Sequence, residues 1–432
     1  MPASPLLLLV PYRYKAAVLY SQIPISASAS GDFVVSRAGN TASRILGNGN
    51  IETGVLANIA RINYPRTGVA SGCAGLLVEP AATNFVLNSQ NTATDWTIGA
   101  NTASGYVDVI GVSGNTVTAS ASGGIGGSVF VRRSLNTALA SGSTYTVSFL
   151  MRQTGAHTIG GYWIGIAGVG DIGGGFDVSG SFSSGAIYSA AGATNRIRRV
   201  ERWGTDVYRC SETFTLTASG TVDRILMGPL GAVNNPAITS SGNTMAFAAP
   251  QIELGAVPTT FIPTTTASVT RNADVVTLSG AVSGCIGQTE GTLYAEIVAQ
   301  PYNNASFPAI LQVDDGADSQ RFAIFIGPSG GIRVRFNASG VNSIFDSTNP
   351  ATLVVGQTYK IAAAFGFNGS QAFYINGVLQ VSGSVTAGPF TAALNRVMLG
   401  HRAGIVSPFL IRSAALYTTR LTNTELAALT TL

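Results

Sequence analysis

The sequence predicts an all-β protein made of two consecutive antiparallel β-sandwiches, or jelly rolls, preceded by an irregular N-terminal arm. Only 10% of the 432 residues are charged, and 52 are glycine. Ala, Ser, Thr and Val are abundant, which suits short strands joined by tight turns rather than helices. A chain of this length can form two or three domains with separate cores.

Residues 1–74 carry the weakest strand signals, because small polar residues alternate there with isolated apolar ones. Such a segment cannot easily close a core of its own. We therefore expect an anchoring arm that lies along another surface. The apolar run at residues 6–10 is short, follows no basic segment and ends at Pro11, so it predicts neither a signal peptide nor a membrane span.

Regular strand patterns begin at residue 75. β-rich segments at 143–153, 161–169, 206–219 and 244–254 alternate with Gly, Asn and Ser turns, which indicates a first sandwich over residues 75–263. A Thr-rich linker covers residues 264–288, and a second sandwich is expected over residues 289–432.

Two local motifs lie within this second block. The pair Asn376-Gly377 suits a type I′ hairpin turn. Thr422 and Glu425 form a capping box, which predicts one short helix near the C-terminus.

The charge distribution argues against nucleic-acid binding. The formal charge is +4, which is small for 432 residues, and the arginines are dispersed. The densest basic stretch, at residues 196–202, is interpreted as a solvated strand face, with Arg196 and Arg198 on the same side. A mean hydropathy of +0.31 favours burial in a permanent assembly, because obligate interfaces are more apolar than free surfaces.

Catalytic chemistry finds little support in the residue types. The chain has only two histidines, His157 and His401, and no serine or cysteine stands in a nucleophile-elbow sequence. Glycoside hydrolysis needs two converging carboxylates, whereas Glu290 and Glu296 are six residues apart around an apolar strand start. We predict a protein that is not an enzyme, with a glycan depolymerase as the alternative.

Exposed aromatic rings are the candidates for glycan binding, because they offer an apolar face beside polar neighbours. Trp203 lies in a hairpin-tip sequence, and Tyr162 and Trp163 precede a glycine-rich loop; Trp163 suits a core position equally well.

One acidic cluster, Asp314, Asp315 and Asp318, is the candidate metal site, and calcium is the hard cation that it would favour. The spacing misses the EF-hand pattern, so a polar hairpin turn is the preferred interpretation and no cofactor is expected.

Several phrases resemble a family of tailed-bacteriophage tail and tail-fibre proteins that carry a carbohydrate-binding-module-like jelly roll. The resemblance covers residues 15–276 and consists of an arm segment followed by Gly-Leu-Leu-x-Glu-Pro, Thr-Asn, Gln-x-Glu-x-Gly, Phe-Ile-Pro-Thr and Arg-x-x-Asp. Two positions depart from the pattern: Ala60 stands where the family has Pro, and Ala82 where it has Arg. The loss at Ala82 removes a guanidinium that could clamp a neighbouring carboxylate.

Residues 289–432 resemble a laminin-G or concanavalin-like lectin domain, most clearly at 356–365 and 371–380. Because this fold hosts many functions, the likeness bears on architecture more than on a ligand.

Together these resemblances imply a non-catalytic virion protein, a tail fibre or tail-associated receptor-binding subunit that attaches to host-surface glycans. They imply a homo-oligomer, with a trimer favoured, on the exterior of the particle after assembly in the host cytoplasm, without membrane insertion. The assembly arm, with Asp32, Arg37, Arg61 and Tyr64, would contact other virion proteins. A capsid decoration or head-fibre protein, a depolymerase tailspike and a secreted lectin are the alternatives.

Overall fold

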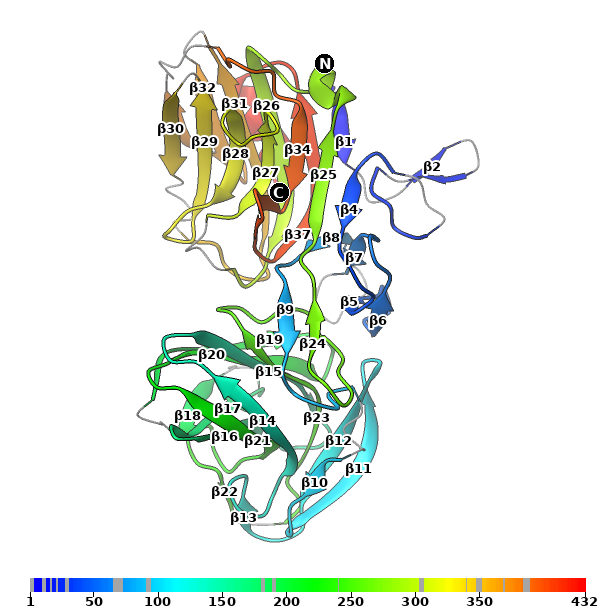
Figure 1. Cartoon of the computed structure of the whole chain (residues 1–432), viewed down its shortest axis with the longest axis vertical. Helices are drawn as coiled ribbons and strands as arrows, with labels where there is room; N and C mark the ends of the chain where they lie inside the picture. The colour runs from blue at the N-terminus through cyan, green and yellow to red at the C-terminus, as the bar shows by residue number, and fades with distance from the viewer. Residues whose placement is uncertain are drawn as a thin grey trace.

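The computed structural model describes residues 4–9, 13–15, 18–20, 22–27, 31–64, 73–90, 95–179, 183–188, 192–239, 241–302, 307–338, 340–346, 352–367, 370–383 and 389–432. The predicted fold class is confirmed: almost all of the regular structure is antiparallel β, and it forms two sandwiches stacked along the long axis of the molecule (Figure 1).

The second sandwich packs two large sheets face to face. One sheet, here called the α1 sheet, has the strand order β33 (Val378–Gly383), β32 (Gln371–Ile375), β31 (Thr358–Gly366), β26 (Glu290–Ala299), β37 (Phe409–Tyr417), β8 (Gly75–Val78) and β7 (Arg61–Asn63). The short strand β1 (Leu7–Leu9) also pairs with β37. The other, here called the β28 sheet, has the order β30 (Val341–Asp346), β29 (Ile332–Ala338), β28 (Arg321–Ile326), β27 (Ala309–Asp314), β34 (Arg396–Leu399), β25 (Val275–Ser279) and β4 (Val34–Ser36).

The first sandwich also has two sheets. One has the order β11 (Thr102–Val109), β12 (Val112–Ala119), β23 (Thr244–Leu254), β15 (Thr144–Gln153), β20 (Val207–Leu216) and β19 (Ala193–Arg202). The other has the order β10 (Thr97–Ile98), β14 (Val131–Leu139), β21 (Gly220–Pro229), β16 (Ile159–Ala167), β17 (Gly170–Asp177) and β18 (Ser184–Tyr188).

Smaller elements complete the fold. They are the pairs β2 (Arg13–Lys15) with β3 (Val18–Tyr20), β5 (Ala42–Ile45) with β6 (Ile51–Val55), β13 (Gly123–Gly124) with β22 (Ala237–Ile238), and β35 (His401–Arg402) with β36 (Ile405–Val406), the 3-10 helix η1 (Ala281–Cys285) and the helix α1 (Asn423–Thr430).

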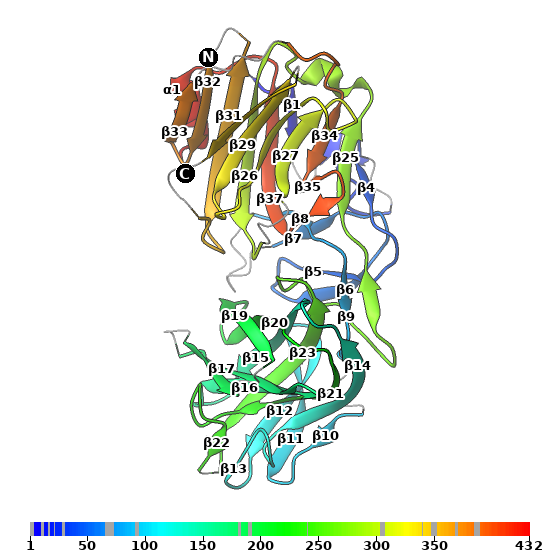
Figure 2. The ribbon, with the colours of Figure 1, turned by 60° about the vertical axis from the view of Figure 1, so that its left-hand side comes forward.

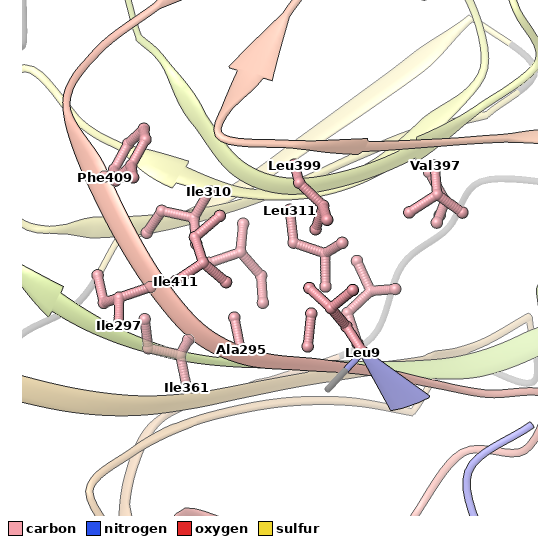
Figure 3. Close-up of a cluster of buried hydrophobic side chains, with 14 of the residues drawn as sticks. Leu9, Ala295, Ile297, Ile310, Leu311, Ile361, Val397, Leu399, Phe409 and Ile411 are labelled. Carbon is pink, nitrogen blue, oxygen red and sulfur yellow. The ribbon is translucent and has the colours of Figure 1, made fainter. Parts of the chain in front are cut away.

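The N-terminal arm is part of the second sandwich rather than a separate layer. The isolated apolar residues Leu9, Phe33, Val35 and Ile62 are buried in the same core as the strands of the C-terminal half. Figure 3 shows Leu9 close to Val397, Leu399 and Leu311 within this core. A segment without a core of its own therefore gains one by adding strands to both sheets.

The strand pairing corrects two of the expected boundaries. The segment Gly75–Val78 was expected to begin the first sandwich, but it pairs with β37 at Phe409–Ile411. The segment Val275–Ser279 was expected in the linker, but it lies in the β28 sheet between β34 and β4. Leu76, Leu77 and Val78 are almost fully buried, as expected for a strand that lies between β37 and β7.

The first sandwich is consequently an insertion within the second. The chain leaves the second sandwich after β8, runs down β9 (Ala82–Asn84), completes the first sandwich, and returns along β24 (Val269–Arg271). β9 and β24 pair antiparallel, and Figure 1 shows them side by side between the two bodies. The hairpin of β5 and β6 lies beside them (Figures 1 and 2).

Candidate functional site

The most distinctive site in the described residues is a buried charged cluster between the two sandwiches, here called the joint. It consists of Arg37 after β4, Arg61 on β7, Glu79 after β8, Arg271 at the end of β24, and Asp274 before β25. The side chains of all five are at most 2% exposed. Three separate parts of the sequence therefore meet at one place that excludes water.

The two carboxylates of the joint bind the guanidinium groups directly. Arg61 Nη1 lies 2.7 Å from Glu79 Oε2, and its Nη2 donates to Asp274. Arg37 Nη1 donates to Asp274 Oδ1 at 2.8 Å. Arg271 lies 3.6 Å from Glu79 and 3.7 Å from Asp274. Arg61 is the central cation, because it binds both acids.

Backbone and hydroxyl groups satisfy the remaining polar atoms of the acids. Glu79 accepts from the Thr260 amide at 2.8 Å and from Thr260 Oγ1 at 2.6 Å. The amide of Glu79 donates to Asp274 Oδ2 at 2.9 Å. Thr260 follows the last long strand of the first sandwich, so this bond ties the inserted sandwich to the strands around it.

The surroundings keep both acids ionised. Burial by itself would raise the pKa of Glu79, but Arg61 and Arg271 hold it well below its usual range. The same balance, with Arg61 first among the opposing charges, lowers the pKa of Asp274. Asp274 and Glu79 also keep the pKa of Arg61 above its ordinary value despite burial. With three cations and two anions, the joint carries a net charge of +1.

A third acid, Glu253 on β23, lies next to the joint in a different electrostatic environment. It accepts from the Thr259 amide at 3.2 Å and from Gln251 Nε2 at 3.3 Å. Burial raises its pKa to about 7, because the neighbouring Arg209 and the bonds from Thr259 oppose burial only in part. Glu253 is therefore the group in the joint region that titrates near neutral pH.

A second set of buried polar residues holds the start and the end of the first sandwich together. Asn84 Nδ2 donates to the carbonyl groups of Pro250 and Ile262 at 3.2 and 2.9 Å. Thr264 Oγ1 lies 2.8 Å from Ser89 Oγ. The sequence segments that resemble the phage family, although far apart in the chain, therefore meet in space around the joint.

This geometry is suited to holding segments in place rather than to reacting with a substrate. A buried ion pair adds little net stability over apolar packing. Removing one partner, however, leaves the other charge buried without compensation, which strongly destabilises the fold. The joint therefore fixes which segments meet. A cavity beside it has a volume of about 10 Å³, room for roughly one water molecule, and is lined by Trp203, Arg209, Gln251 and Phe261 among others.

The predicted arm residues divide between the joint and the surface. Arg37 and Arg61 are in the joint, and their guanidinium groups are used within the chain. Asp32 is exposed, and Tyr64 is half-buried with its ring close to Gly47. The side chains of Arg37 and Arg61 are therefore buried within the chain and are not exposed for contact with other virion proteins. Glu79, Arg271 and Asp274 were noted in the family phrases, but nothing in the sequence indicated that they meet.

The departures at Ala60 and Ala82 have structural consequences. The amide of Ala60 donates to the Pro24 carbonyl at 2.8 Å, a bond that a proline at this position could not make. Ala82 lies opposite Arg271 in the pairing of β9 with β24. Arg271 itself lies 3.6 Å from Glu79, whose carboxylate also binds Arg61.

The aromatic glycan candidates do not form an exposed platform. Trp203 lies in the turn between β19 and β20, as predicted, but it is only 3% exposed, and Arg209 covers its ring at 5.2 Å. Tyr162 is fully buried, with its ring centroid 6.0 Å from that of Phe149. The exposed rings expected at these two positions are therefore wrong, because both rings fill cores. Trp163 is half-buried and packs over Gly126.

The acidic cluster of the second sandwich is engaged by cations and turn amides. Asp314 accepts from Arg396 Nε and Nη2 at 2.8 and 2.9 Å, and Asp318 pairs with Arg321. Asp315 accepts from backbone amides of the turn between β27 and β28. Nowhere in the described ranges do three or more His, Cys, Asp or Glu side chains come together as a possible metal site.

The basic stretch on β19 is not a solvated face. Arg196 and Arg198 do share one side of the strand, but both bind Glu212, whose side chain is fully buried. Their charges neutralise that acid.

None of the helices in the described part of the chain has the length and apolar character needed to cross a membrane.

Comparison with solved structures gives several likenesses that cover about a third of the chain. The CBM40 domain of the Ruminococcus gnavus IT-sialidase, bound to α2,3-sialyllactose, is 23% identical over 33% of this chain and 84% of that one, with a TM-score of 0.28. The NanB sialidase of Streptococcus pneumoniae is 20% identical over 35% of this chain and 26% of that one, with a TM-score of 0.30. Domain 4 of the arabinanase AbnA from Geobacillus stearothermophilus, in complex with arabinotriose, is 20% identical over 37% and 73%, with a TM-score of 0.29.

No curated protein matches the chain. Residues 272–427 match a family model described as the concanavalin A-like lectin/glucanases superfamily. The match begins 17 residues before the expected domain start at 289 and includes Asp274 and β25, in agreement with the strand pairing. This part of the chain is therefore similar to concanavalin A-like lectin domains.

Proposed function

We propose that the protein is a non-catalytic structural subunit of a tailed-phage particle, a tail fibre or tail-associated subunit, that attaches to host-surface glycans through its second sandwich. The observation that carries the proposal is the joint: the phrases resembling the phage family assemble into a buried connection that holds a lectin domain at one end of an elongated molecule.

A rigid connection is useful for adhesion because single lectin sites bind weakly. Several copies displayed together raise the effective concentration of sites and convert weak contacts into firm attachment. A flexible linker would lose part of that gain, whereas Thr260 of the first sandwich is bonded to both Glu79 and Arg61 of the joint. The homo-oligomer, a trimer by family resemblance, belongs to this proposal.

Assembly with other virion proteins is proposed to use the exposed apolar residues of the arm. Leu6, Val34 and Leu56 are 57%, 63% and 50% exposed. Figure 1 places β1, β4 and β6, on or beside which they lie, along the same side of the molecule. Burial of such residues on the particle exterior would also account for the high mean hydropathy of the chain.

A purely adhesive role is also consistent with the contacts of the candidate acids. Glu296 lies 3.5 Å from Arg412 on the neighbouring strand, so its carboxylate already has a cationic partner. A depolymerase would need two free, converging carboxylates.

Two measurements test this function. Fluorescently labelled full-length protein should bind host cells and lose binding after periodate oxidation of surface glycans, without releasing reducing ends. Immunogold labelling of particles should place the protein at the tail. Gold on the capsid would favour a decoration or head-fibre protein, reducing-end release would favour a depolymerase, and failure to bind cells would overturn the adhesive role.

A further inference from the structure

Two adjacent residues, here called the threonine link, connect the first sandwich to the joint. Thr259 is bonded to the first sandwich: its amide donates to Glu253 at 3.2 Å, and its hydroxyl group bonds to the same carboxyl group. Thr260 is bonded to the joint: its amide and hydroxyl group donate to Glu79 at 2.8 and 2.6 Å, and Arg61 Nη1 donates to its hydroxyl oxygen at 2.8 Å. Because the two threonines share a peptide bond, movement of one displaces the other.

The two acids that hold the threonine link differ in the charge of their partners. Glu79 lies 2.7 Å from Arg61. The described groups that bond to Glu253 are neutral: the amide and hydroxyl of Thr259, and Gln251 Nε2 at 3.3 Å. Glu253 is only 1% exposed. A buried carboxylate that has no ion-pair partner is costly, so the ionised form of Glu253 favours any rearrangement that admits water.

The cations on neighbouring elements are bound elsewhere. Arg209 of β20 donates to the carbonyl oxygen of Thr259, and Arg271 of β24 lies beside the two acids of the joint. Both arginines oppose the effect of burial only in part, and the pKa of Glu253 rises to about 7. The residues paired with Glu253 on strands β15 and β9 are uncharged: Thr146 and Asn84.

We propose that Glu253 makes the threonine link sensitive to pH: release of its proton favours an open form in which both threonines leave their acids, and the connection between the two sandwiches loosens. This device is independent of the proposed adhesive function. The pairing of β9 with β24 is not part of the link, so it keeps the sandwiches together in the open form.

The pH range follows from the two environments of Glu253. Opening takes its carboxyl group into water, where the ordinary pKa of 4.5 applies. Between pH 4.5 and about 7, the closed link holds a proton that the open link has released. The equilibrium constant for opening therefore rises by about tenfold per pH unit in this range and levels off above it.

Hydrogen–deuterium exchange of the full-length protein at pH 5 and pH 8 measures the opening. Rates for residues 255–262 are divided by those of an unstructured peptide at the same pH, so that the remaining change reports the opening equilibrium. This corrected exchange should be faster at pH 8 by roughly 70-fold, as the two pKa values require. Glu253→Gln should remove the change. Glu52→Gln, which removes a partly exposed acid from the hairpin of β5 and β6, is the matched control and should keep it.

Pulsed electron paramagnetic resonance measures the connection itself. Spin labels are attached to cysteines introduced at the exposed residues Ala121 and Ala428, one in each sandwich, after Cys73 and Cys285 are replaced by serine. The distance distribution should be broader at pH 8 than at pH 5, and equally narrow at both pH values with Glu253→Gln.

Thr260→Val provides a second variant, because it removes the two hydroxyl bonds to the joint without changing a titrating group. Its distance distribution should be broad at both pH values, and thermal unfolding shows that each variant is folded. A narrow distribution in this variant would overturn the role of the link. Corrected exchange that is independent of pH, or equally dependent on pH with Glu253→Gln, would overturn the role of Glu253.

Discussion

At the scale of single residues, Glu79 is the acid on which the joint depends most. It binds Arg61 and Thr260 and lies within reach of Arg271, with no exposed surface. The variant Glu79→Gln leaves three buried cations with a single carboxylate, so we expect a loss of about 3–5 kcal/mol in the free energy of unfolding. Urea denaturation followed by circular dichroism measures this loss.

The matched control for Glu79 is Glu52→Gln. Glu52 also pairs with an arginine, Arg44, but its side chain is 39% exposed. Exposed ion pairs contribute less than about 1 kcal/mol, so this variant should unfold close to wild type. Equal effects of the two substitutions would show that the joint is not the tightly coupled cluster described above.

Glu253 predicts how stability depends on pH. Its ordinary pKa of 4.5 rises to about 7 in the folded chain, so between these values the folded state holds a proton that the unfolded state has released. Its contribution to stability is therefore complete below pH 4.5 and falls as pH rises to about 7. The variant Glu253→Gln mimics the protonated form. It should match wild type at pH 4.5 and exceed it by roughly 2–3 kcal/mol at pH 8.

Urea midpoints of the two proteins at both pH values measure this difference. Comparing variant with wild type cancels the other titrating groups, including His157 and His401. Burial lowers the pKa of both histidines, so their contributions to stability rise with pH, opposite to that of Glu253. A variant less stable than wild type at pH 8 would mean that the native joint uses an ionised Glu253.

At the scale of elements, strand β4 tests whether the arm belongs to the second sandwich. Adjacent residues provide the comparison: Val35 is 4% exposed and pairs with Val276, whereas Val34 is 63% exposed. Val35→Asp buries an unpaired charge and should destabilise the protein by more than about 3 kcal/mol. Val34→Asp should change stability by less than about 0.5 kcal/mol. If Val35→Asp is tolerated as well as Val34→Asp, β4 is not part of the core.

Local elements were predictable because their signals are contiguous in sequence. Asn376 and Gly377 have φ angles of 49° and 80°, as a type I′ turn requires, and the capping box of Thr422 and Glu425 is present at α1. The short strands of the arm were not predictable in this way. β4 and β7 have three residues each. β4 pairs with the distant strand β25, and Arg61 of β7 binds Asp274, 213 residues later.

At the scale of the whole molecule, the same limit applies to the insertion. The composition and strand patterns predicted two sandwiches. They could not predict that one sandwich takes its strands from both ends of the chain, because that arrangement produces no local sequence pattern. The N-terminal and C-terminal strands of the second sandwich meet at Glu79 and Asp274, which are 195 residues apart. The Glu79 amide donates to the Asp274 carboxylate at 2.9 Å. The family phrases marked both residues. Pairing them required the structure, because a charge pattern does not specify which acid meets which arginine.

The insertion predicts that the lectin family match alone is not a stable unit. A fragment of residues 272–432 lacks Leu9, Phe33, Val35 and Ile62, and so exposes one side of the second core. We expect it to aggregate on expression and to bind dyes specific for exposed apolar surface. Adding residues 1–81 in trans should recover soluble protein, and size-exclusion chromatography measures the recovered fraction. A fragment that is monomeric and folded alone would contradict the role given to the arm.

The converse experiment removes the inserted sandwich and keeps the arm. Ala82 and Arg271 are paired residues on antiparallel strands, so their Cα atoms are separated by about 4.5–5.5 Å, a span that a two-residue turn can close. Replacing residues 83–270 by Asn-Gly retains all five charges of the joint but loses the two bonds from Thr260 to Glu79 and the bond from Arg61 to Thr260. Water can replace those bonds once the joint is no longer covered. We therefore expect a monomeric, cooperatively unfolding sandwich of lower stability than the full chain, with its glycan binding intact. Misfolding of this protein despite the retained arm would show that the second sandwich needs the first in order to fold, and that the two are not separable units joined at one site.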